Sequence, residues 1–124
     1  MRPARDEMYG IGGVALVERW NGTKWAIQKT PNPVGASSIF LFGVSCTSAS
    51  ACTAVGYYYN GTTYVTLAER WNGTKWSIQQ TPNPTGGSGN QLVGVSCAST
   101  SACTAAGQYS NGTTTVTLAE RWNR

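Results

Sequence analysis

The sequence predicts an all-β protein assembled from repeated antiparallel units. Residues 18–68 and 69–119 align without a gap, and 37 of the 51 aligned positions are identical. A third copy begins at residues 120–123. Gly, Thr, Ser and Asn are abundant, and no stretch has the apolar spacing of an amphipathic helix. A repeat of this length and regularity indicates one supersecondary unit that stacks on copies of itself.

Four strand-like runs, which we name A to D, are expected in the complete repeat. They cover residues 41–46, 52–59, 62–71 and 75–80. Asn60-Gly61 and Asn72-Gly73 separate the last three runs and predict type I′ hairpin turns, in which both central residues have positive φ. Residues 81–84 contain two prolines, which cannot donate to a strand ladder and so end strand D.

Alternation along strand C predicts two different faces. Val65, Leu67 and Trp71 should share one face, while Ala68 and Arg70 share the other with Thr66. Tryptophans occupy two positions on either side of the turn between strands C and D, where they can pack across the ladder. We therefore assign a structural role to Trp20, Trp25, Trp71, Trp76 and Trp122.

The cysteines form two pairs with the same spacing. Cys46 and Cys52 are six residues apart, and so are Cys97 and Cys103 in the next repeat. The repeat favours two local disulfides over the other possible connectivities. A zinc site is the alternative, but zinc sites favour shorter cysteine spacings and often use histidine, which this chain lacks. Disulfides persist in oxidising surroundings, so we expect an extracellular or cell-surface protein. We expect no cofactor.

A four-stranded meander that recurs every 40–50 residues or so is typical of a β-propeller blade. The chain then contains a partial blade with strands C and D (8–30), a full blade (39–81) and a partial blade with strands A to C (91–124), after an N-terminal arm (1–7). One such chain cannot close a ring. We expect several copies to form a ring in which strand D (24–30) of each copy completes the last partial blade of its neighbour, or to add head to tail into a filament. Alternatively, the chain is a fragment of a longer protein.

The motif of the full blade resembles a kelch repeat. Gly56 is followed by tyrosines, by Val65, by the segment Glu69-Arg70-Trp71-Asn72-Gly73-Thr74-Lys75-Trp76 and by Pro82-Asn83-Pro84. Where kelch blades usually carry a Gly-Gly pair, this chain has Val55-Gly56 and Ala106-Gly107. The cysteine pair is more similar to that of secreted bacterial kelch-like repeats. The resemblance implies a propeller that binds partners. A minority of the family, similar to galactose oxidase, are copper enzymes, but that centre needs histidine.

Differences between the two repeats suggest a binding surface. Of 14 differing positions, seven lie between residues 29 and 42 and four are Val55, Tyr57, Tyr59 and Tyr64. In a meander, the D–A connection and the B–C loop lie at the same rim. We therefore predict a ligand-binding rim formed by Tyr57, Tyr59, Tyr64, Asn90 and Gln108. The alternatives are that exposed loops vary freely and that the tyrosines pack between blades.

The residue inventory does not predict an enzyme. There is no histidine to act as a base, the cysteines are assigned to disulfides, and Glu18, Glu69 and Glu120 occur once per unit, each followed by Arg. Lys and Arg are scattered rather than clustered, which argues against nucleic acid as a partner. No apolar run is long enough to span a membrane.

We therefore expect a non-catalytic extracellular module that binds glycan or protein at this rim, as an oligomer. The alternative is a structural protein that assembles into a ring or filament by strand exchange.

Overall fold

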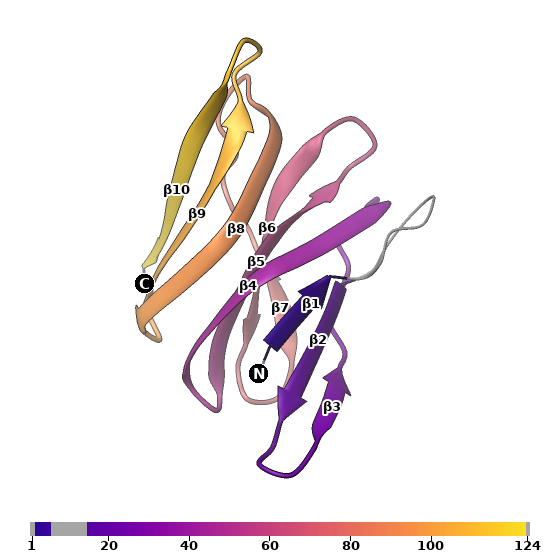
Figure 1. The fold of residues 1–124 in the computed structure, drawn as a ribbon, viewed down its shortest axis with the longest axis vertical. Helices are drawn as coiled ribbons and strands as arrows, with labels where there is room; N and C mark the ends of the chain where they lie inside the picture. The colour runs from indigo at the N-terminus through magenta and orange to yellow at the C-terminus, as the bar shows by residue number, and fades with distance from the viewer. Residues whose placement is uncertain (1, 6–14, 124) are drawn as a thin grey trace.

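The computed structural model describes residues 2–5 and 15–123, which form ten strands in three antiparallel sheets (Figure 1). The all-β antiparallel prediction is confirmed. The strands are β1 (Arg2–Arg5), β2 (Ala15–Trp20), β3 (Trp25–Gln28), β4 (Ser38–Ser48), β5 (Ala51–Tyr59), β6 (Tyr64–Trp71), β7 (Trp76–Gln79), β8 (Ser88–Ser99), β9 (Ala102–Ser110) and β10 (Thr115–Asn123).

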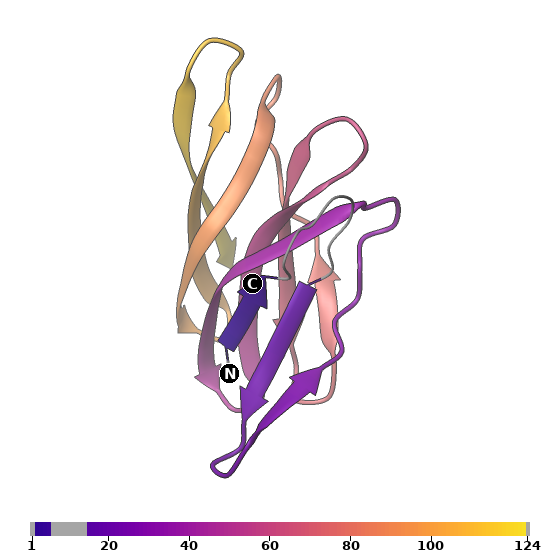
Figure 2. The ribbon, with the colours of Figure 1, turned by 45° about the vertical axis from the view of Figure 1, so that its right-hand side comes forward.

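The three sheets follow one another in chain order. The first sheet has the order β1-β2-β3, the second β4-β5-β6-β7 and the third β10-β9-β8. The second sheet is the predicted A-B-C-D meander, and the third has A, B and C. Figure 1 and the turned view in Figure 2 both show the second sheet between the other two, with β4 running close to β8 on one side and to β1 and β2 on the other.

The first sheet contains a strand with no counterpart in the repeat. Residues 2–5, expected within an N-terminal arm, form β1 and pair with β2, with Arg2 opposite Glu18 and Arg5 opposite Ala15. β1 thus lies beside β2 as β5 lies beside β6. Strand C of the partial blade predicted over 8–30 is observed as β2, and residues 8–14 lie outside the described part of the chain.

The hairpins lie where Asn-Gly predicts them, but the predicted turn type is wrong. Trp71 pairs with Trp76, so the loop contains the four residues 72–75, and only the glycines among the described residues have positive φ. The Asn72 side-chain oxygen accepts hydrogen bonds from the backbone N–H groups of Thr74 and Lys75 (2.8 and 2.9 Å). This local side-chain contact replaces the positive φ that a type I′ turn would require of asparagine.

A β-bulge bends strand β4 and explains two glycines. Leu41 pairs with Gly56 and Gly43 with Val55, so Phe42 is the extra residue. A Cβ atom on Gly56 would overlap the backbone carbonyl of Phe40. Gly107 in β9 occupies the same position against the carbonyl of Gln91. These glycines let the backbones of neighbouring strands approach closely beside the bulge.

The core consists of two apolar clusters, one at each junction between sheets. The first cluster joins the first and second sheets and contains Val17, Ile39, Leu41, Cys52, Ala54, Leu67 and Trp76. The second joins the second and third sheets and contains Val55, Ala68, Leu92 and Ala105. Leu67 and Ala68 are neighbours in β6 but belong to different clusters, as the predicted alternation requires. The second sheet is therefore covered on both faces.

Two disulfides tie the A–B hairpins. Cys46 is bonded to Cys52 and Cys97 to Cys103, the pairing that the repeat predicts. In both cases the two cysteines are direct cross-strand partners, with Cα atoms 4.0 Å apart. Both bonds close short loops, so each restricts the unfolded chain only modestly.

Two glycines of the third sheet allow a test of the close approach between strand backbones beside the bulge. Gly107→Ala should lower the free energy of unfolding by about 2 kcal/mol or more, because the new methyl group overlaps a backbone carbonyl that cannot move without breaking the ladder. Gly94→Ala, nearby on β8, should be close to neutral, because its Cβ would meet no atom within 4 Å. Denaturant unfolding of the oxidised proteins measures both. Equal effects of the two substitutions would contradict the assignment.

Candidate functional site

The D–A and B–C connections of the second sheet lie at one rim, as predicted. The backbone N–H of Ser37 donates to the Tyr59 carbonyl (3.1 Å). The N–H of Gly89, at the start of β8 directly after the next D–A connection, donates to Thr63 Oγ1 (2.9 Å). The hairpin with the Cys46–Cys52 disulfide lies at the opposite rim, where the Trp71 indole N–H donates to the Ala49 carbonyl (3.1 Å).

Five aromatic rings gather beside the B–C loop. We call them the aromatic cluster: Phe40 and Phe42 from β4, Tyr57 and Tyr59 from β5, and Tyr64 from β6. Tyr57 is central, with its ring centroid 5.2 Å from Phe40, 5.3 Å from Phe42 and 5.2 Å from Tyr64. The Tyr59 and Tyr64 rings are also 5.2 Å apart, edge to face.

Strand register explains why these rings meet. Phe40 lies opposite Tyr57, and Tyr59 lies opposite Tyr64. Tyr57 is two residues from Val55, so the aromatic cluster occupies the face of the second sheet that looks toward the third. Phe40 is 8% exposed beneath the others, whereas Phe42 is 37% exposed. The cluster therefore has a buried base and a surface open to solvent.

Of the residues predicted for the rim, the structure brings together only the three tyrosines. Asn90 is buried, and its side-chain nitrogen donates to the Tyr64 carbonyl (3.1 Å), so it fastens β8 to β6 from below the surface. Gln108 is exposed on β9, at the repeat position of Tyr57, and does not join the cluster. Tyr58 points to the other side and packs against the first core cluster.

Sequence reasoning missed Phe40 because it began strand A at residue 41, and it missed Phe42, which it placed in that strand, because it counted both only among the differences around the D–A connection. The sequence nevertheless contained a signal for both residues, namely the differences between the repeats. All five members of the aromatic cluster differ between the repeats, and their counterparts are Gln91, Val93, Gln108, Ser110 and Thr115. The third sheet keeps the same strands without these rings. The aromatic cluster is therefore not required for this type of sheet to form.

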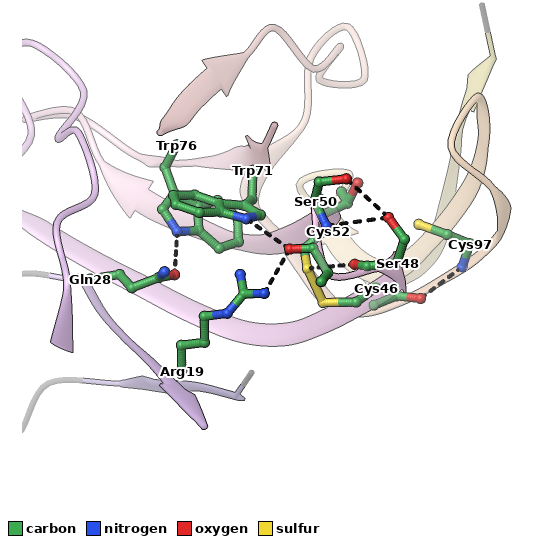
Figure 3. Close-up of a disulfide and its surroundings, with 12 residues drawn as sticks. Arg19, Gln28, Cys46, Ser48, Ser50, Cys52, Trp71, Trp76 and Cys97 are labelled. Atoms are coloured by element: carbon green, nitrogen blue, oxygen red, sulfur yellow. Dashed lines mark hydrogen bonds between the residues drawn. A yellow bond between two sulfur atoms is a disulfide. The ribbon is translucent and has the colours of Figure 1, made fainter. Parts of the chain in front are cut away.

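A second set of side chains joins neighbouring sheets, as Figure 3 shows for the first junction. Arg19 Nη2 donates to the Ala49 carbonyl (2.8 Å) and its guanidinium lies 5.7 Å from the Trp71 ring centroid. Trp76 Nε1 donates to Gln28 Oε1 across the same junction (3.0 Å). The next junction repeats the arginine contact, with Arg70 Nη2 2.6 Å from the Thr100 carbonyl and its guanidinium 5.0 Å from the Trp122 ring.

Each junction also buries a glutamate. Glu69 is fully buried on the side of β6 that bears Leu67 and Trp71, and neither carboxyl oxygen has a hydrogen-bond partner among residues 2–5 and 15–123. Burial raises the pKa of Glu69 from 4.5 to about 8, so the side chain is neutral at pH 7.

Glu120 repeats this arrangement at the second junction. Its carboxyl oxygens are also buried and have no hydrogen-bond partner in the described part of the chain, and burial raises its pKa from 4.5 to about 7. The side chain borders a cavity of about 70 Å³ between the second and third sheets, together with Val55, Leu92 and Trp122. The walls are mainly apolar, which accounts for the direction of the pKa shift.

Comparison with known proteins adds no identification: no protein-family model, curated protein or solved structure matches this chain. Among the described residues, no group of His, Cys, Asp or Glu could hold a metal ion. The same part of the chain contains no helix long and apolar enough to cross a membrane. The two disulfides are consistent with an oxidising environment.

Because Glu69 is buried, we predict that the free energy of unfolding falls as the pH rises. Folded Glu69 keeps a proton up to about pH 8, whereas the unfolded chain releases it near 4.5, so unfolding becomes easier across this interval. Glu69→Gln should remove the part of the slope that Glu69 contributes, leaving that of Glu120, and raise the melting temperature by several degrees at pH 8, with little effect at pH 4.5.

Thermal unfolding of the oxidised protein at these two pH values tests this expectation. Glu18→Gln is the matched control, because Glu18 occupies the same repeat position but is partly exposed. A pH dependence that Glu69→Gln leaves unchanged would contradict the assignment.

Proposed function

We propose that this chain is a non-catalytic, extracellular binding module whose sheets are kelch-like β-propeller blades, and that it binds its ligand through the aromatic cluster. The observation that carries the proposal is the concentration of repeat differences in one place. Five positions that are aromatic in the second sheet lack aromatic side chains in the third, and those five rings touch one another at one rim.

The chemistry of the aromatic cluster favours a sugar ring over a flat apolar ligand. Tyrosine presents a flat apolar face for stacking together with a hydroxyl that can donate or accept a hydrogen bond. Tyr57 and Tyr64 contact the apolar base that Phe40 forms, and Tyr59 packs against Tyr64, so a pyranose could stack on one tyrosine ring while its hydroxyls bond to the others. Such a site needs no metal and no ionised residue.

Transplanting the other repeat's residues tests the site while preserving the fold. In the triple variant Tyr57→Gln, Tyr59→Ser and Tyr64→Thr, each position receives the residue that the third sheet already carries. We expect wild-type protein to bind at least one polysaccharide in a panel of soluble plant, fungal and bacterial polymers, measured by affinity electrophoresis. The triple variant should lose at least about tenfold in affinity, equivalent to about 1.4 kcal/mol.

The matched control is Tyr58→Gln, because Tyr58 lies in the same strand but on the opposite face. Equal polysaccharide binding by wild type and the triple variant would place the site elsewhere. Binding of a surface protein but of no polysaccharide would replace the glycan by a protein ligand at the same cluster.

Structural self-assembly is a second candidate function. The third sheet has no strand beyond β10 among the described residues, and β10 pairs there with β9 alone. β3 has four residues, three of them exposed. Exchange of β3 between copies would give β10 a fourth-strand partner, as β7 pairs with β6.

A further inference from the structure

Each sheet has two unlike faces, and the molecule packs them in one order. The arginine face of a sheet carries Arg19 or its repeat equivalent. The tryptophan face carries Trp71 or its equivalent, with the glutamate two residues before it. At the first junction the arginine face of the first sheet meets the tryptophan face of the second. At the second junction the arginine face of the second sheet meets the tryptophan face of the third.

This order leaves one face of each kind uncovered by the described residues. Val17 and Arg19 of β2 point toward the second sheet, so Leu16, Glu18 and Trp20 lie on the other side, which is the tryptophan face of the first sheet. By the same alternation, Ala119 and Arg121 of β10 lie on the outer, arginine face of the third sheet, and both are exposed.

The tryptophan face of the first sheet exposes large apolar side chains. Trp20 is 45% exposed and Ile27 is 75% exposed. In the covered second sheet, Ile78 occupies the repeat position of Ile27 and is 39% exposed. The difference in exposure is that expected between a covered and an uncovered copy of one surface.

We propose that a second copy of this chain covers the free arginine face with its own free tryptophan face. Arg121 of one copy would lie over Trp20 of the next, as Arg19 lies over Trp71 and Arg70 over Trp122. Contact between two like faces would not reproduce the arginine–tryptophan contact that both observed junctions share, which favours this pairing. The inference rests on self-assembly, the second candidate function above, and specifies its interface.

The interface differs from strand exchange because β3 stays paired with β2 in every copy. It is also heterologous: each added copy brings a new free arginine face, so growth can continue into a ring or a filament. The first sheet lacks the A–B hairpin that supplies the Ala49 and Thr100 carbonyls, so the arginine would keep its ring contact without that hydrogen bond. Association should therefore be reversible and dependent on concentration.

Complementation between two single variants tests this geometry. Arg121→Ala damages only the arginine face, and Trp20→Ala damages only the tryptophan face. Light scattering after size exclusion should show wild type growing with concentration, while each variant alone associates at least about tenfold more weakly. A 1:1 mixture should form a dimer and stop there, because one intact face of each kind remains and the two outer faces are damaged.

Controls separate failure of the interface from failure of self-assembly. Lys75→Ala, which removes an exposed cation from a hairpin loop of the second sheet, should assemble like wild type. If Trp20→Ala lowers the melting temperature, Ile27→Asp replaces it, because that side chain is already 75% exposed. A wild type that is monomeric at every concentration would overturn self-assembly itself.

Two other outcomes would overturn this interface alone. The first is self-association that neither Arg121→Ala nor Trp20→Ala weakens. The second is a mixture that stays monomeric although wild type assembles.

Discussion

The packing of unlike faces between successive sheets is the constraint on which the rest of the structure depends. A small antiparallel sheet cannot bury enough apolar surface alone, and here each sheet uses a neighbour to do so. Leu67 and Ala68 belong to different core clusters because both faces of the second sheet are covered. The arginine–tryptophan contact fixes the order, since it joins a side chain of one sheet to a ring and a hairpin carbonyl of the next.

Most of the local structure follows from the sequence pattern. Alternation in strand C predicted the two faces of β6, the Asn-Gly pairs predicted the hairpins, and the repeat indicated the cysteine pairing. β1 was not predictable in this way, because residues 2–5 have no second copy to compare. The prediction of the turn type was wrong because two tendencies of Asn-Gly compete: positive φ at asparagine, and hydrogen bonds from the asparagine side chain to the backbone. The side-chain hydrogen bonds determined the conformation of these loops.

The candidate site was predictable only in part. The three tyrosines were found through repeat differences. Phe40 was missed because strand A was predicted to begin at residue 41, and Phe42 was missed within that strand because the bulge at Phe42 hides the strand's alternation. Asn90 was predicted to bind ligand, whereas its side chain is buried and donates to the Tyr64 carbonyl. Its repeat counterpart is Ile39, a core residue, and comparison of these two positions would have predicted that Asn90 is buried. A differing position is thus informative only when its place in the sheet is known.

The residues that join neighbouring sheets differ from those that form the aromatic cluster. Arginine, glutamate and tryptophan at the junctions are the same in all three copies, including the unpartnered carboxyls of Glu69 and Glu120, although burying such groups costs free energy. The aromatic cluster, by contrast, is present in one sheet and replaced in the next. A module built in this way can add sheets through an unchanging interface while each sheet presents a different surface at the rim. Binding and assembly are then compatible functions, because they use different residues of the same strands.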